Sequence, residues 1–134
     1  MKSEGASLSP VVDELMLLVS RSHCVPGGER DVEVALREAL ENAVFHGNRG
    51  DPTKQVYIGC RCEPGKGLSI VVRDQGEGFD LGAVQHLTDV TTTDLGSEHG
   101  IPLMRQLMDE VYYELGGREL HMRKRSDPRK DPAF

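Results

Sequence analysis

The chain has 134 residues and a formal net charge of −6, with three tyrosines, three phenylalanines and no tryptophan. This length predicts one domain over residues 1–134, with residues 1–8 and 126–134 as flexible ends. The acidic balance disfavours direct nucleic-acid binding, and the scarcity of aromatic rings argues against a base-stacking surface. No run approaches the ~20 apolar residues of a membrane span, so we expect no membrane association.

The three cysteines lie at positions 24, 60 and 62. An odd count and a Cys-x-Cys spacing argue against both a disulfide framework and a zinc knuckle. Cys60 and Cys62 fall on one face of a predicted strand, where we interpret them as small buried hydrophobes. A reducing, cytoplasmic location fits this usage.

Two amphipathic helices are predicted first. Ser9 and Pro10 are typical of a capped helix start, and an apolar stripe of Val12, Leu15, Leu18 and Val19 continues to about residue 21. A second helix is predicted over residues 31–46, ending at Gly47. Its stripe follows i, i+3, i+4 spacing through Val32, Ala35, Leu36, Ala39, Leu40, Ala43 and Val44.

Strands dominate the remainder. Residues 54–63 alternate as a strand that turns at 64–67 into a second strand over 68–73. Residues 81–100 are long and weakly patterned, which is typical of a functional or mobile segment. A short helix over 101–108, with Leu103, Met104, Leu107 and Met108 inward, precedes a hairpin of strands 111–115 and 118–123. This order predicts an α+β fold, a two-layer sandwich with helices on one face of a mostly antiparallel sheet.

Glu38 and Asn42 lie about 40° apart on the flank of the second helix, beside its apolar stripe, and His46 follows one turn later. A carboxylate can act as a general base, and an amide oxygen is a neutral ligand for Mg²⁺ between phosphates. The alternative for this pair is an ordinary solvated helix flank.

The stretch Asp74-Gln75-Gly76-Glu77-Gly78 directly follows a predicted strand. The carboxylate could accept a hydrogen bond from the exocyclic amine of a base, while the glycines let the ring lie close. Gly96 and Gly100 lead into the short helix, where free N–H groups suit phosphates. An ordinary turn and a flexible loop are the respective alternatives.

Together these stretches resemble the histidine-kinase-like ATPase (Bergerat) fold, and specifically the free-standing anti-sigma factor serine-protein kinases. The resemblance covers about residues 9–125. Residues 38–47 match the N box, residues 74–79 the adenine-binding G1 box, and residues 100–111 the last glycine box with its helix. The longer sensor histidine kinases share the fold, and we expect this chain to be a stand-alone domain without their phosphoacceptor helices.

The resemblance implies a role for each matched position. Glu38 would activate the attacking hydroxyl, Asn42 would ligate Mg²⁺, and Asp74 would bind the adenine amino group. The other nucleotide-binding positions would be His46, Gly76, Gly78, Gly96 and Gly100, beneath a lid at residues 81–99. It further implies an ATP-dependent serine/threonine kinase that phosphorylates a small anti-anti-sigma (STAS-type) antagonist and sequesters an RNA polymerase sigma factor, as a homodimer.

One departure concerns Glu98, which stands where the family has the first glycine of Gly-x-Gly. Its charge, ~4 Å from a phosphate, would cost about 1 kcal/mol in water and about 4 kcal/mol at an effective dielectric of ~20. Two other readings therefore stay open. One is a non-catalytic regulator with a degenerate nucleotide site, and the other is a kinase of a different signalling pathway.

Overall fold

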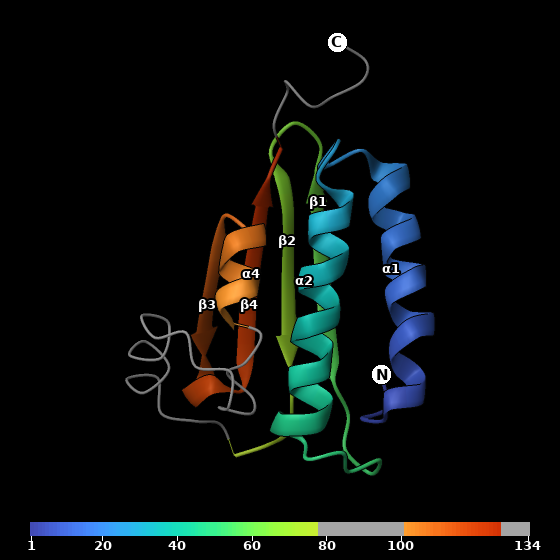
Figure 1. Ribbon diagram of the computed structural model, residues 1–134, viewed down its shortest axis with the longest axis vertical. Coiled ribbons are helices and arrows are strands. Elements are labelled where there is room, and N and C mark those ends of the chain that lie inside the picture. The colour runs from blue at the N-terminus through green and yellow to red at the C-terminus, as the bar shows by residue number, and fades with distance from the viewer. Residues whose placement is uncertain (78–100, 127–134) are drawn as a thin grey trace.

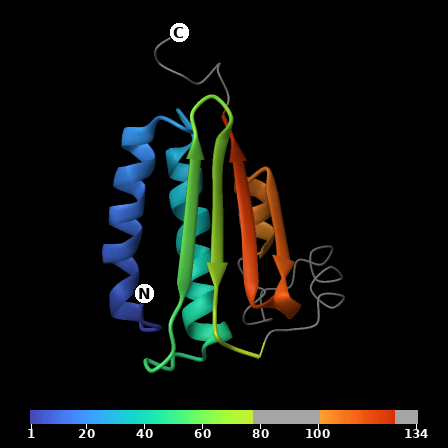
Figure 2. The ribbon, with the colours of Figure 1, turned by 180° about the vertical axis from the view of Figure 1, so that it is seen from behind.

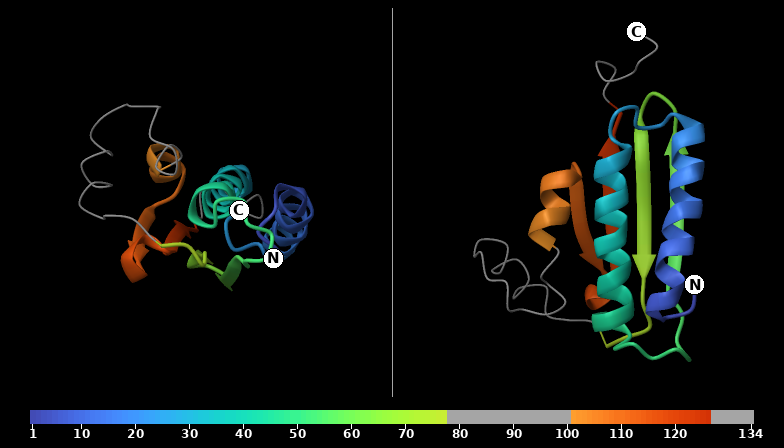
Figure 3. Two further views of the ribbon diagram at one scale, coloured as in Figure 1. Left: turned by 90° about the horizontal axis from the view of Figure 1, so that it is seen from below. Right: turned by 45° about the vertical axis from the view of Figure 1, so that its right-hand side comes forward.

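The computed structural model describes residues 1–77 and 101–126. Three helices, α1 (Leu8–Ser22), α2 (Glu29–Glu41) and α4 (Ile101–Leu107), lie on one face of a four-stranded sheet. Figure 2 shows the sheet from behind, where none of the described helices covers it, and the left view of Figure 3 shows the two layers end-on. The predicted α+β sandwich is confirmed.

The sheet contains β1 (Tyr57–Glu63), β2 (Gly67–Arg73), β3 (Glu110–Glu114) and β4 (Glu119–Arg125) in the order β1-β2-β4-β3. All three strand pairings are antiparallel. The last strand in the chain therefore lies inside the sheet. Alternate residues of β2 and β4 form the floor of the core, namely Leu68, Ile70, Val72, Leu120 and Met122.

Helix α2 forms the centre of the helical layer. All seven residues of its predicted stripe are buried. The regular helix begins two residues before the predicted start and ends at Glu41, where it continues as a π-helical turn, η2 (Asn42–Gly47). The sequence pattern did not predict this change of helix type, which alters the direction of the side chains in the N box.

Helix α1 differs from the prediction at both its cap and its stripe. Ser7, not Ser9, occupies the N-cap position, and Pro10 lies in the first turn, where backbone N–H groups have no helical acceptor. Val12 and Val19 are buried, but Leu18 is 57% exposed. The inward placement of Leu18 was wrong because α1 is the outermost helix and packs chiefly on α2 (Figure 1).

Strand β1 starts three residues later than predicted because residues 54–56 pair with the start of the chain. Ser3 N donates to Lys54 O at 3.1 Å and Val56 N donates to Met1 O at 2.8 Å. The first three residues, expected to be flexible, are thus held, and Ser3 is buried.

The interpretation of Cys60 as buried was wrong. Cys60 is exposed, while Cys62 is half-buried. Strand β1 forms an edge of the sheet, so its middle residues are covered less than those of β2.

The short helix α4 packs against α2 and buries Ile101 and Met104, with Met108 buried just beyond its end. Leu103, expected inward, is 37% exposed, because so short a helix presents only one stripe to the core. In residues 1–77 and 101–126, no helix has the length and apolar character to cross a membrane.

Candidate functional site

A cavity opens where the end of α2 meets the ends of β2 and β4. About 580 Å³ of space there is not filled by protein atoms, a volume that includes open solvent at the mouth. Apolar side chains from α2, η2, β2 and β4 line it, namely Ala39, Ala43, Val72 and Leu120. Asn42, His46 and Asp74, which the sequence analysis selected, line the same cavity.

Asn42 begins the π-helical turn. Its backbone N–H reaches the carbonyl oxygens of both Glu38 and Ala39, so the i→i−4 ladder is still intact at this residue. Wider turns of this kind occur frequently at functional sites. The side-chain Nδ2 of Asn42 is buried, and no protein acceptor is within reach in the described structure. A buried donor without a partner is costly, so this nitrogen is a position where water or a ligand can accept a hydrogen bond.

Asp74 follows β2 directly, and its backbone N–H continues the ladder by donating to Arg118 O at 3.0 Å. Its Oδ1 accepts a 2.8 Å hydrogen bond from Gly76 N, which fixes the orientation of the carboxyl group. Burial raises the pKa of this carboxyl, and the Gly76 N–H and the positive charges of Arg118 and Lys54 oppose the rise only in part.

Two glycines pack the Asp74 turn tightly against the end of η2. A Cβ at Gly47 would collide with the Asp74 carboxyl group, and a Cβ at Gly76 would collide with the carbonyl oxygen of Gly47. The sequence analysis assigned Gly76 to a close approach of the nucleotide. In the structure Gly76 itself approaches another backbone segment, and it does not line the cavity.

Asn48 is a site residue that the sequence analysis missed. It is fully buried, its Oδ1 accepts from Gln75 N at 2.7 Å, and its Nδ2 donates to Gln55 O at 3.0 Å. Gln75 in turn accepts from Gln55 N at 2.7 Å. One asparagine thereby connects the end of η2, the following loop and the Asp74 turn. Its partners are backbone groups, which leave no signal in a side-chain pattern.

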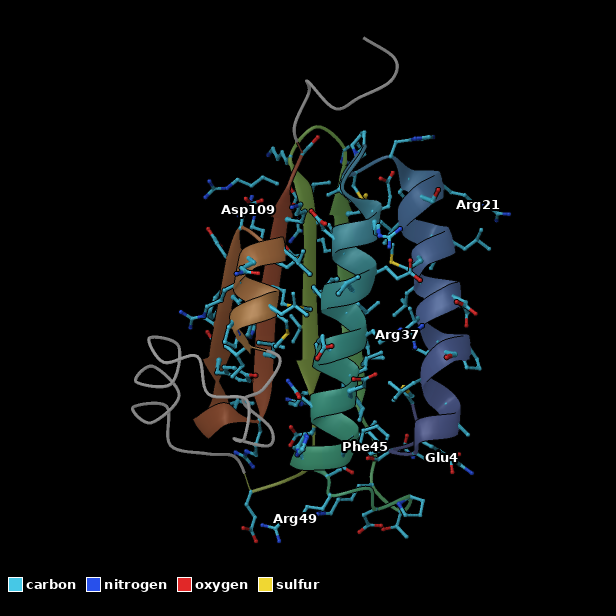
Figure 4. The ribbon with its side chains drawn as sticks, in the orientation of Figure 1. Glu4, Arg21, Arg37, Phe45, Arg49 and Asp109 are labelled. Atoms are coloured by element: carbon cyan, nitrogen blue, oxygen red, sulfur yellow. The ribbon has the colours of Figure 1, made fainter. Side chains whose placement is uncertain are left out.

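Two arginines that the sequence analysis did not select also line the cavity. Arg49 lies in the loop that follows η2, at the lower end of the molecule in Figure 4, and its guanidinium lies 3.9 Å from the Glu77 carboxylate. Both partners are more than four-fifths exposed, so this pair contributes little to stability. Arg118 donates from Nε to Leu115 O at 3.0 Å. Glu77 and Asp74 line the same cavity, so the two arginines and the two carboxylates balance in formal charge.

Glu38 lies one turn before Asn42 on α2 and is half-buried. It does not line the cavity within the described residues. Gly78, Gly96, Glu98 and Gly100 lie outside the described residues, as does the segment expected to form a lid.

The residues present fit a magnesium-bound purine nucleotide. The apolar lining suits a flat base, and Asp74 supplies a half-buried carboxylate acceptor beside it. Asn42 supplies an amide whose nitrogen and oxygen can exchange by a half-turn, so the same position could offer a neutral oxygen to a hard cation.

An apolar cavity with these groups, enclosed by a helix and an antiparallel sheet, defines a class of ATP-binding domain. A family model described as "Histidine kinase-like ATPase domain" matches residues 1–124, and the chain belongs to this family.

Curated relatives indicate a smaller group within this ATPase family. An anti-sigma F factor of Geobacillus thermodenitrificans is 30% identical over 111 residues, covering 81% of this chain and 66% of that protein. One of Bacillus cytotoxicus is 29% identical over 124 residues, covering 89% and 75%. The serine-protein kinase RsbW of Bacillus licheniformis is 35% identical over 91 residues, covering 63% and 56%. The resemblance to anti-sigma factor kinases is confirmed, although the chain spans less than two thirds of the RsbW sequence.

A solved structure supports the fold independently. The mycobacterial sensor histidine kinase MprB aligns with a TM-score of 0.56 over 90% of this chain and 96% of that one. The sequence identity is 16%, so this likeness concerns the fold alone.

Proposed function

We propose that the chain is an ATP-dependent serine/threonine protein kinase of the anti-sigma type. The observation that carries the proposal is the convergence of Asn42 and Asp74 in one cavity of mixed polar and apolar lining, with the Asn42 Nδ2 buried and without an acceptor among the described residues. The relatives named as anti-sigma factors and as a serine-protein kinase supply the class of partner.

In this proposal each residue has one task. Asp74 accepts a hydrogen bond from the amino group of adenine, and its carbon neighbours in the cavity exclude water from the ring. Asn42 holds Mg²⁺, which when bound neutralises charge on the phosphates and orients them. Glu38 accepts the proton of the substrate hydroxyl as that oxygen bonds to the γ-phosphorus and ADP leaves.

The partners follow from the class. We propose that one is an RNA polymerase sigma factor, held inactive, and the other a small anti-anti-sigma (STAS-type) protein, which accepts the phosphoryl group. Phosphorylation of the antagonist leaves the sigma factor bound, and the unphosphorylated antagonist displaces it. This partner switching would take place in the cytoplasm.

The test is calorimetry of the whole chain with Mg-ATP, ATP alone and Mg-GTP. We expect micromolar affinity for Mg-ATP only, because Asp74 faces an amino group in adenine but a carbonyl in guanine. Asp74→Asn should remove this preference. Asp13→Asn, which removes an exposed carboxylate from α1, is the matched control. No binding at millimolar Mg-ATP would contradict the kinase.

Glu98→Gly separates the kinase from a non-catalytic regulator. If Glu98 faces the phosphates, the glycine variant should bind ATP about tenfold more tightly, since 1.4 kcal/mol is a factor of ten. ADP should gain less if the repulsion involves the γ-phosphate. Unchanged affinity would remove the electrostatic argument. A sigma factor that co-elutes with a chain unable to bind ATP would favour the regulator.

We also propose a homodimer, on the basis of the family resemblance. Light scattering at micromolar concentrations should then give about twice the 14.8 kDa of one chain. A single species at 14.8 kDa would contradict it.

A further inference from the structure

The open face of the sheet carries a cluster of ionisable side chains at the turn between β3 and β4. It consists of Glu114, the last residue of β3, and Glu119 and His121 on β4. On β4, Glu119 and His121 alternate with the buried Leu120 and Met122, so they lie on the face of the sheet that the helices do not cover, the face turned to the viewer in Figure 2. The proposed kinase makes no use of them.

The register brings the two carboxylates directly opposite each other, because Glu114 and Glu119 are partners across the ladder. Like charges in such a position destabilise a strand pair unless a cation lies between them. The Nε2 atom of His121 lies 2.6 Å from Glu119 Oε1 and 3.4 Å from Glu114 Oε2. Both carboxylates therefore converge on one ring nitrogen.

The ring of His121 is held in place by its cross-strand partner. Tyr112 stacks on it with centroids 4.8 Å apart and planes at 2°. The side chains of Glu119 and His121 are 16% and 21% exposed, whereas that of Glu114 is 55% exposed. Glu119 and His121 are thus largely fixed, whereas the exposed side chain of Glu114 can rotate toward them.

We propose that Glu114, Glu119 and His121 bind a divalent transition metal ion of the zinc class. Their ligand atoms all lie within 4.8 Å of one another. With metal–ligand bonds of about 2.0–2.2 Å, a tetrahedral zinc site separates its ligand atoms by about 3.3–3.6 Å. The 3.4 Å separation between His121 and Glu114 already matches, and the His121–Glu119 hydrogen bond opens by a small side-chain rotation. Water completes the coordination.

The mixed ligand set selects against magnesium. Imidazole suits zinc, copper and nickel, while magnesium prefers oxygen ligands alone. The site therefore does not compete for the ion that accompanies a nucleotide. Arg73 lies 3.7 Å from the second oxygen of Glu119 and is half-exposed, so it moderates the negative charge without occupying the ligand position.

The proposed metal site lies beside one wall of the cavity. Between Glu114 and Glu119 lies the turn η4 (Leu115–Gly117), and both Gly117 and Arg118 line the cavity. An ion held across the turn would fix this wall of the cavity. It would also stabilise the folded chain through mass action, because the unfolded chain does not hold the three ligands together.

The test is calorimetric titration of the reduced, nucleotide-free chain with ZnSO₄. We expect one zinc ion to bind per chain. Zinc affinity should fall more than about tenfold in both His121→Phe and Glu114→Gln, since even the loss of a residue that supports a metal ligand lowers metal affinity by that factor. Phenylalanine retains a ring to stack on Tyr112 and removes the nitrogen. Glu110→Gln, on the same face of β3, is the matched control and should bind as the parent does. Equal affinity in all four proteins would overturn the proposal.

Cysteine is the competing ligand, because Cys60 is exposed and thiolates bind zinc strongly. Titration with CoCl₂ distinguishes the two sites by the visible spectrum. Bound cobalt should show no thiolate-to-metal charge-transfer band, and Cys60→Ser should leave both affinity and spectrum unchanged. A charge-transfer band that disappears in Cys60→Ser would overturn the proposal.

Discussion

Asn48 and Gln75, 27 positions apart in the chain, are joined by a 2.7 Å hydrogen bond from the Gln75 backbone N–H to Asn48 Oδ1. This bond fixes the turn that presents Asp74 to the cavity. The position of the proposed adenine-binding carboxylate therefore depends on a residue that does not line the cavity.

Asn48→Ala should lower the free energy of unfolding by about 1–3 kcal/mol, because it removes two part-buried hydrogen bonds of about 0.5–1.5 kcal/mol each. ATP affinity should fall with it, since the Asp74 turn loses its anchor. Urea denaturation and calorimetry measure the two effects. Gln55→Ala, which keeps the backbone groups of that residue, is the control. A comparable loss of stability and ATP affinity in this variant would argue against Asn48 as the anchor of the turn.

Asn42→Ala should have the opposite effect on stability. The substitution removes an amide whose Nδ2 is buried without a protein partner, so the melting temperature should stay level or rise. Magnesium-dependent nucleotide binding should be lost. A collapse of the melting temperature would instead identify Asn42 as a structural residue, comparable to Asn48.

Asp74→Asn should stabilise the ligand-free protein at neutral pH. Burial raises the pKa of Asp74 above its ordinary value of 3.8, so the charged form is disfavoured in the folded chain. This loss of folding stability is present above the folded-state pKa of Asp74 and disappears as the pH falls toward 3.8. Melting curves of both proteins across this range should converge at the acidic end. A difference that does not depend on pH would exclude this cause.

Gly47→Ala should destabilise the protein by about 1–3 kcal/mol, because the new methyl group overlaps the Asp74 carboxyl group. Moving that carboxyl should also weaken ATP binding. Gly59→Ala in β1 is the matched control, since a Cβ there meets nothing closer than 3.6 Å. Similar losses of stability in both variants would show that strand or helix propensity, rather than the overlap, is responsible.

The sequence predicted the elements whose pattern is periodic. The seven-residue stripe of α2 and the two hairpins could be located because burial repeats every 3.6 or 2 residues. The exposure of Cys60 could not be predicted, because an alternating pattern does not reveal whether a helix covers the strand. The π-helical turn at Asn42 changes backbone hydrogen bonds without changing the order of apolar residues.

The candidate site was predicted in part for similar reasons. Asn42, His46 and Asp74 belong to local motifs, and they line one cavity. Arg118 reaches it only because β4 lies beside β2, a tertiary contact that no local spacing encodes. Asn48 acts through backbone groups, so its position in a loop gave no indication of its role.

Strand order also has a consequence during synthesis. β4 is the last strand to leave the ribosome, yet it pairs with both β2 and β3. Until it emerges, β2 has one unpaired edge and β3 has no partner in the sheet, and the apolar face of the helices is only partly covered. The domain should therefore complete its folding only after β4 has emerged from the ribosome. A nascent chain stalled before Glu119 should be protease-sensitive and bound by chaperones, whereas one extended well past Arg125 should resist proteolysis.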